Sequence, residues 1–307
     1  MSAANDLQVQ CFAKRNPTGL FAEGSRPSLL YVSHVRPNTN QHPRILHSHA
    51  HHLELLLICG GSSSFMIHNS RRDLQAGDMV IYNAGVVHDD LTGPDTEIEY
   101  YCVAIGDLQL PGLRENALME DDSACVYPTG SSFPVLKDIC DMMFRSLAEE
   151  EQDAANFCRG LLESLLTRAL TVIRQHAGSV PEKTEDEDVL GVRIKNYIDA
   201  HYREPLTLQE IGNDLNVSSY YMSHVFKRAT GYSPIQYLLR RRLGEAQTLL
   251  ISTSLSIAEI AGLVGFDTQN YFNAQFTKHV GVPPKQYREN YVIGNRHKKT
   301  EKHQNTK

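Results

Sequence analysis

The chain has 307 residues, 41% hydrophobic and 21% charged, which is typical of a globular protein with room for two domains. Its net charge of −6 is unevenly distributed: residues 190–307 carry 16 Lys and Arg against 9 Asp and Glu, whereas residues 1–189 carry 14 against 27. A basic C-terminal part argues against a uniformly acidic protein and favours a nucleic-acid-binding module there, because phosphate neutralisation needs local positive charge.

The six cysteines are scattered, all precede the basic part, and form no Cys-x-x-Cys pair. This pattern excludes a zinc finger and favours buried free thiols in a reducing compartment. No stretch approaches the ~18 apolar residues of a membrane-spanning helix, and the N-terminus lacks the apolar run of a signal peptide. We therefore expect a cytoplasmic location and no membrane partner.

Short β-type runs alternate with turn residues from Leu29 to about Ile105, which predicts a small β-barrel or sandwich. The expected strands are Leu29–Val35, Leu53–Cys59, Ser64–His68, Met79–Tyr82 and Glu97–Ile105. Apolar residues at three- and four-residue steps then predict two helices, Phe133–Glu150 and Ala154–His176. The apolar stripe of the second helix packs either on its own barrel or on a second subunit.

Two groups of residues in the β region resemble the two motifs of a cupin barrel. The first contains His47-Ser48-His49, Glu54 and Gly61, and the second contains Gly77-Asp78, Gly85 and His88. In metal-binding cupins the four matching positions hold the metal. The resemblance therefore implies a polar site at His47, His49, Glu54 and His88, which we expect to bind a small effector. A divalent metal at the same four residues is the first alternative, because imidazole and carboxylate suit such ions, and a purely structural role is the second. We expect His51 and His52 to be exposed loop or strand-edge residues rather than ligands.

The segment Ser179–Asp188 contains Pro181 and a dense set of acidic residues, which predicts an exposed linker. A helix is expected directly after it, from Val189 to His201. The last residues, from Gly294 to Lys307, are polar and basic and predict a disordered tail.

The segment from Leu206 to Arg288 contains the same pattern twice. Residues Tyr221-Met222, Phe226, Gly231, Pro234 and Tyr237 recur 50 residues later as Tyr271-Phe272, Phe276, Gly281, Pro284 and Tyr287. A fixed interval signals a duplicated supersecondary unit. Each copy predicts a helix-turn-helix, with a small residue in the first helix (Gly212 or Ala261) and a capping residue before the second (Ser218 or Asp267).

The duplicated segment resembles the DNA-binding domain of the AraC/XylS family of bacterial transcription regulators, from Val189 to Arg288. Besides the duplication, the resemblance is carried by Leu243–Leu250, by Ser256–Ala261 and by Gly265-Phe266 with Tyr271-Phe272. It implies an all-α domain in which a helix from about Pro234 to Ile251 joins two helix-turn-helix units on promoter DNA.

The second helix of each unit should enter a major groove with its N-terminal residues at the base edges. In the first unit this helix is Ser219 to Thr230, and its predicted inward residues are Tyr221, Met222, Val225 and Phe226. By their position in the family motif, Tyr220, Ser223 and His224 are expected to contact DNA bases. Lys227 and Arg228 are expected to contact phosphate, which positions the protein without specifying sequence.

In the second unit the helix is expected from Thr268 to His279, with Tyr271, Phe272 and Phe276 inward. The predicted outward residues are Gln269, Asn270 and Asn273, whose amides can pair with adenine. Ala274 and Thr277 stand where the family often has basic residues, which predicts a weaker hold on DNA. On the joining helix, Arg241 is expected to contact the phosphate backbone.

The sequence thus predicts an α+β protein of two domains. A cupin-like effector-binding and candidate dimerisation domain spans residues 1–180, a linker 181–188, the DNA-binding domain 189–292 and the tail 293–307. We expect a homodimeric activator that contacts RNA polymerase, responds to a small molecule such as a sugar, and needs neither catalytic residues nor a cofactor. The alternative is a metal-dependent cupin enzyme fused to a DNA-binding module.

Overall fold

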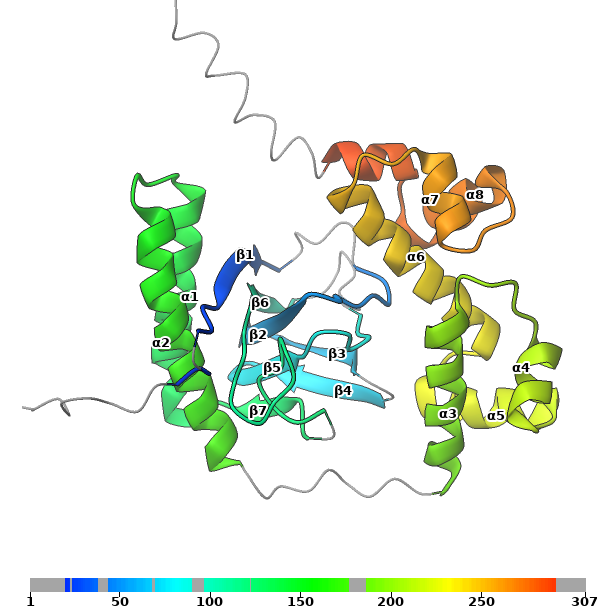
Figure 1. Cartoon of the computed structure of the whole chain (residues 1–307), viewed down its shortest axis with the longest axis horizontal. Coiled ribbons are helices and arrows are strands. Elements are labelled where there is room, and N and C mark those ends of the chain that lie inside the picture. The colour runs from blue at the N-terminus through cyan, green and yellow to red at the C-terminus, as the bar shows by residue number, and fades with distance from the viewer. Residues whose placement is uncertain are drawn as a thin grey trace, which may run out of the picture.

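The computed structural model describes residues 20–22, 24–37, 44–67, 70–89, 97–121, 123–176 and 186–290, with the backbone alone at 66, 70, 71 and 186–188. It shows a β-rich part covered by two long helices, and beside it an all-helical part (Figure 1). We call residues 20–176 the β-domain and residues 186–290 the helical domain. Cys11, residues 181–185 of the predicted linker and the whole predicted tail lie outside the described residues.

The β-domain contains a five-stranded sheet in the order β1-β6-β2-β5-β7 and a two-stranded sheet of β3 and β4, all antiparallel. The strands are β1 Ser28–Val35, β2 His52–Gly60, β3 Ser62–Ile67, β4 Ser70–Gln75, β5 Asp78–Tyr82, β6 Glu99–Gly106 and β7 Val126–Pro128. The five predicted strands are confirmed, whereas β4 and β7 were not predicted. Among the described residues the ladders form two sheets rather than one closed barrel, and the cupin-like, β-then-helix architecture holds.

Side chains alternate between the two faces of the five-stranded sheet, as the two-residue period of a strand requires. One face, which includes Leu55 and Val103, belongs to a core shared with the helices α1 and α2. The opposite face, which includes Leu56 and Cys102, packs against Phe65 of the two-stranded sheet. The second face therefore lies inside the domain, between the two sheets.

Helices α1 (Phe133–Ala148) and α2 (Ala154–Gln175) follow a 3-10 turn, η1 (Gly130–Ser132), and lie side by side against the sheet (Figure 1). Of the predicted α2 stripe, Leu162, Leu165 and Leu166 are fully buried in the β-domain core, so the stripe packs mainly on its own domain. Phe157 remains 46% exposed. The outer surface of these helices is thus left partly apolar.

The helical domain contains the helices α3 to α8 and a further helical segment over residues 284–290, built around one apolar core. The labelled helices are α3 Asp186–His201, α4 Leu208–Leu215, α5 Ser219–Thr230, α6 Pro234–Ser252, α7 Ile257–Leu263 and α8 Gln269–Val280. Helix α3 begins three residues earlier than predicted, at Asp186.

The two helix-turn-helix units end their second helices in the same way. Gly231 (φ 77°) and Gly281 (φ 90°) both adopt the left-handed conformation that terminates a helix. At the start of α5 the Ser218 side chain accepts a hydrogen bond from the backbone of Tyr221, as predicted. The prediction for Asp267 is wrong, because Thr268 accepts the equivalent bond from Tyr271 and is the N-cap of α8.

Two further features of the described residues are the state of their cysteines and the length and polarity of their helices. Five described cysteines carry free thiols, at Cys59, Cys102, Cys125, Cys140 and Cys158. Within the described ranges, no helix combines the length and the apolar character needed to cross a membrane.

Candidate functional site

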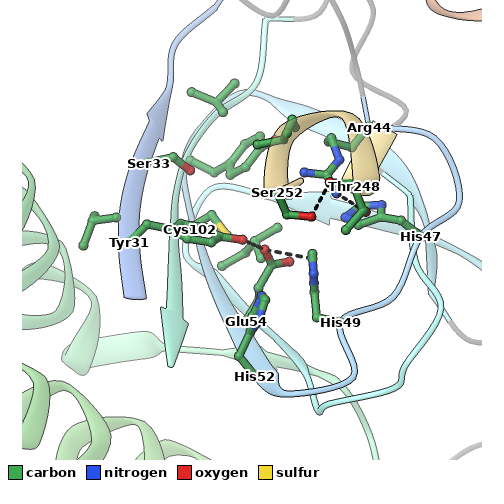
Figure 2. Close-up of a pocket in the computed structure, with 15 residues that line it drawn as sticks. Tyr31, Ser33, Arg44, His47, His49, His52, Glu54, Cys102, Thr248 and Ser252 are labelled. Atoms are coloured by element: carbon green, nitrogen blue, oxygen red, sulfur yellow. Dashed lines mark hydrogen bonds and ion pairs between the residues drawn. The ribbon is translucent and has the colours of Figure 1, made fainter. Parts of the chain in front are cut away.

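A cavity of about 490 Å³ lies between the β-domain and helix α6 (Figure 2). Most of its wall comes from the β-domain: from β1, β2, β6 and the segment between β1 and β2. Thr248, Ile251 and Ser252 of α6 complete it. The lining from the β-domain is Tyr31, Val32, Ser33, Val35, Arg44, His47, His49, His52, Glu54, Leu56, Tyr100 and Cys102. The cavity therefore has walls from both domains.

The four residues predicted from the cupin-like motifs meet at one place, and three of them line this cavity. His47, His49, Glu54 and His88 are all buried, and their potential ligand atoms lie within 4.8 Å of one another. Glu54 lies on β2, while His47 and His88 face each other across an isolated antiparallel bridge. The predicted convergence of these side chains is confirmed, although His47 and His49 lie before β2 and not on a regular strand.

Backbone carbonyls orient two of the three imidazoles. Nδ1 of His47 donates to the Ile45 carbonyl at 2.9 Å, and Nδ1 of His88 donates to the Val86 carbonyl at 3.0 Å. In the neutral ring this leaves Nε2 as an acceptor. Yet Nε2 of His88 lies 3.1 Å from a carboxylate oxygen of Glu54, and Nε2 of His49 lies 3.3 Å from the other. His49 can donate from Nε2 to Glu54, whereas the contact between His88 and Glu54 joins two acceptors and needs a proton or a metal ion between them.

Burial and mutual contact perturb the protonation of the cluster. Burial, followed by the nearby positive charge of Arg44, holds the pKa of His47 well below its usual value. Burial also lowers the pKa of His49, against the opposing effect of Glu54. Burial alone would raise the pKa of Glu54, but hydrogen bonds with His49 and His88 outweigh it and hold that pKa well below the usual range. A carboxylate beside neutral imidazoles is the form in which these side chains bind a metal.

The donor set fits a divalent first-row metal. Three imidazoles and one carboxylate are ligands that such ions accept, and second ring nitrogens bonded to carbonyls are the usual support for metal-binding histidines. The Nε2 atom of His49 is buried, and its polar contact is the Glu54 carboxylate at 3.3 Å, so both groups face the same point. The same arrangement can equally hold polar oxygens of a small molecule.

Two residues at the site were missed or misplaced by sequence reasoning. The Tyr31 hydroxyl on β1 donates to Oε1 of Glu54, and burial followed by the Glu54 charge raises the pKa of Tyr31. His52 was expected to be exposed, but it lines the cavity and stacks on His49 with ring centroids 4.1 Å apart. Burial lowers the pKa of His52 to about 4. No motif marked Tyr31; His52 could have been found from its position two residues before Glu54.

The candidate DNA-reading helix of the first unit, α5, presents polar side chains outward. Tyr220 is 77% exposed, and its ring lies 4.4 Å from that of the exposed His224. Lys227 and Arg228 are exposed, as expected for phosphate contacts. Ser223 is half-buried and donates to the Ser219 carbonyl, which leaves its hydroxyl oxygen free to accept. The first unit thus combines an aromatic-imidazole pair with two cations.

Helix α8 of the second unit exposes neutral side chains over its first turns and a lysine, Lys278, in its last turn. Gln269, Asn270 and Ala274 are exposed, whereas Asn273 is half-buried and its side-chain oxygen Oδ1 is buried. The predicted inward orientation fails at one position of each unit, because Tyr221 is 47% and Tyr271 54% exposed. These two matched tyrosines lie at the edge of the apolar face and belong to the surface that sequence reasoning missed.

Comparison with known proteins agrees with both parts of the structure. A family model described as an AraC-like ligand binding domain matches residues 29–170, and one described as a helix-turn-helix domain matches residues 211–290. The chain belongs to the AraC family of transcription regulators. It is a DNA-binding regulator with an effector-binding N-terminal domain, and it falls among regulators rather than enzymes.

Three AraC-type relatives illustrate the similarity. The chain is 29% identical over 252 residues to the uncharacterized HTH-type transcriptional regulator YdiP of Escherichia coli, covering 80% of this chain and 81% of that one. It is 33% identical over 146 residues to the HTH-type transcriptional activator RhaR of Cronobacter sakazakii, covering 46% and 50%. It is 22% identical over 245 residues to the lactose operon transcription activator of Staphylococcus xylosus, covering 79% and 85%.

One DNA-contact prediction for this AraC-type domain is contradicted. Arg241 is 5% exposed, and its guanidinium donates to Ser48 Oγ of the β-domain at 3.0 Å and lies 3.5 Å from Asp199. It also lies over the Tyr202 ring, 4.6 Å from the centroid. A guanidinium enclosed in this way cannot reach a phosphate; it joins the two domains instead.

Proposed function

We propose that this AraC-family regulator binds promoter DNA through α5 and α8 and senses a small molecule in the cavity between the β-domain and α6. Residues 1–180 form the sensing part and residues 189–292 the DNA-binding part. The observation that carries the proposal is the composition of the cavity wall. Polar side chains at its floor and an α6 wall on the other side support an effector position between the sensor and the helix that joins both DNA-reading units.

The cavity suits an oxygen-rich effector such as a sugar. Its polar lining includes hydrogen-bond donors and acceptors, among them Tyr31, Arg44 and Ser252. The apolar Leu56 and Ile251 lie beside them. Ring faces of a sugar are apolar and its hydroxyls donate and accept, so mixed walls of this kind are complementary to it. A relative that activates a lactose operon supports the same class of effector.

The four-residue cluster would contact the effector directly or hold a divalent metal. When bound, the metal would supply Lewis-acid positions for effector oxygens. His47, His49, Glu54 and His88 are the residues that would hold it, and the Nδ1 contacts of His47 and His88 would keep their Nε2 atoms directed at it.

We further propose that the protein is a homodimer that activates transcription by contact with RNA polymerase. The exposed apolar side chains of α1 and α2, Val135, Met142 and Phe157, support dimerisation through this outer surface. Two relatives named as activators support the direction of regulation.

The proposal is tested with purified protein and DNA from directly upstream of its gene. Gel-shift titration at moderate salt should show binding that unrelated DNA does not displace. A thermal-shift screen of sugars, organic acids and amino acids should reveal a compound that raises the melting temperature, because a ligand of the folded state stabilises it. That compound should change the affinity for DNA. Absence of specific DNA binding with and without the compound would refute the function.

A further inference from the structure

Two short segments of the β-domain carry the polar cluster on one side and the domain interface on the other. We call Arg44–His49 and Val86–Asp89 the bridge segments. They pair with each other through two backbone hydrogen bonds between His47 and His88, of 2.9 and 3.0 Å. Between them they contribute three of the four cluster residues, His47, His49 and His88.

The neighbours of these histidines contact the helical domain. Ile45, Leu46 and Val87 belong to the apolar core of the helical domain and not to that of the β-domain. The Ile45 backbone N–H donates to Gln247 Oε1 at 2.8 Å, at a side chain that is fully buried. Cluster and interface therefore share the same backbone: Leu46 and Ser48 contact the helical domain, and His47 between them belongs to the cluster.

Polar contacts extend this interface along α6. Arg44 donates to the Thr248 hydroxyl at 2.9 Å, at the rim of the cavity (Figure 2). Arg241 donates to Ser48, and Arg240 lies 3.7 Å from the buried carboxylate of Asp89. Each of these contacts joins a bridge segment to α6.

The backbone approach at Gly244 leaves no room for any side chain. A Cβ atom at this position would lie 1.9 Å from the carbonyl oxygen of Leu46 and 2.6 Å from that of Ile45. Both are backbone atoms of a bridge segment, so the clash is relieved only if the bridge segment or the helix moves. Gly244 is thus the position at which docking can be broken by one methyl group.

We propose that divalent metal binding by the cluster and docking of α6 on the bridge segments are coupled. The inference rests on the proposed sensing role of this site. A metal held by His47, His49, Glu54 and His88 fixes both bridge segments in the arrangement that α6 contacts. Coupling is reciprocal by thermodynamic necessity, so displacement of α6 must weaken metal binding by the same factor as metal loss weakens docking. The position of the helix-turn-helix pair thereby reports on the occupancy of the cavity.

The test is a titration of the full-length protein with Co²⁺ alone, followed by its visible absorption bands, in the wild type and in Gly244→Ala. Gly262→Ala is the matched control, because Gly262 is also helical but has open space around its Cβ position. Alanine favours a helix over glycine at both sites, so a loss at Gly244 cannot come from helix propensity. Thr248→Val, which removes the hydroxyl that Arg44 contacts, is a second variant should Gly244→Ala fold poorly.

We expect one equivalent of Co²⁺ to bind the wild type and Gly262→Ala alike, and Gly244→Ala to bind about 10-fold more weakly, within the usual range of allosteric coupling. Thr248→Val should shift in the same direction by less. Small-angle X-ray scattering should show a larger radius of gyration for Gly244→Ala.

Absence of Co²⁺ binding to the wild type, or equal affinity in the wild type, Gly244→Ala and Thr248→Val, would overturn the coupling. Gel shifts on the same preparations distinguish a failure of the coupling from a failure of the proposed function. Specific DNA binding by a wild type without coupling leaves the regulator standing, whereas absence of DNA binding refutes the regulator whatever the metal titration shows.

Discussion

The two helix-turn-helix units are alike inside and unlike outside. Phe226 and Phe276 are both fully buried, and Tyr237 and Tyr287 lie against them with ring centroids 5.4 Å apart in each case. On the surface, α5 carries two cations in its last turn and an imidazole paired with Tyr220. Helix α8 exposes amides and Ala274, and of the two matched cations it has only one, Lys278.

This difference indicates which residues serve the fold and which serve recognition. Matched packing residues retain the same geometry after duplication, because any change there costs stability in either unit. Outward side chains have no such constraint, so their divergence reflects what each unit does on DNA. The first unit is therefore equipped for both base and phosphate contacts, and the second mainly for amide contacts to bases.

The largest expected effect tests whether the cores of the two helix-turn-helix units are equivalent. Phe226→Ala and Phe276→Ala should each lower the free energy of unfolding by roughly 3–5 kcal/mol, because both remove a fully buried ring and leave a cavity. Urea unfolding followed by circular dichroism measures this. A loss in one unit several times that in the other would break the claimed equivalence of the two cores.

The two units should contribute unequally to specific DNA recognition. His224→Ala should weaken specific DNA binding by about 1–3 kcal/mol, the usual cost of losing a base contact, while Asn273→Ala should cost less, because the Asn273 oxygen is buried within the protein. Ser223→Ala should follow His224→Ala. Gel-shift titrations on one upstream fragment compare them, and equal losses at His224, Ser223 and Asn273 would show that both units read DNA alike.

Capping should be equal in the two units, because the caps Ser218 and Thr268 stand at matched positions of the 50-residue repeat. Ser218→Ala and Thr268→Ala should each destabilise the helical domain by about 1 kcal/mol, because each leaves a backbone N–H at the helix start without its side-chain acceptor. Asp267→Ala is the control and should change the melting temperature little. A larger shift for Asp267→Ala than for Thr268→Ala would contradict the observed cap.

The smallest expected effect concerns the salt dependence of DNA binding. Lys227→Ala should weaken binding to all DNA sequences uniformly and reduce the slope of log affinity against log salt by about one, because one phosphate contact is lost. Thr277→Ala, at the matched position of α8, should leave the slope unchanged. A slope that is unchanged by Lys227→Ala would remove this lysine from the interface.

Patterned elements could be predicted from sequence, and weakly patterned ones could not. Five strands and all the main helices were found because their apolar residues recur at the strand or helix period. Strand β4, with the sequence Ser-Arg-Arg-Asp-Leu-Gln, buries Leu74 but otherwise lacks an apolar run, and β7 has three residues. Their strand conformation comes from pairing with β3 and β5 and leaves little local signal.

The candidate site was partly predictable for a similar reason. His47, His49, Glu54 and His88 could be grouped through motif spacing, but the partners supplied by distant segments could not. Tyr31 reaches Glu54 from β1, and Thr248 and Ser252 reach the cavity from α6, 194 and 198 residues after Glu54 in the sequence. Arg241 shows the converse error: a basic side chain on a predicted DNA-binding domain was taken as a DNA contact, whereas domain docking buries it.

The most direct test of the account is the affinity of the full-length chain for DNA upstream of its gene, measured for the wild type, His224→Ala and Asn273→Ala against unrelated DNA. The account predicts that the wild type prefers the upstream site by at least about 10³-fold, as specific DNA-binding proteins do, and that His224→Ala loses more of this preference than Asn273→Ala. Equal affinity of the wild type for upstream and unrelated DNA would contradict it.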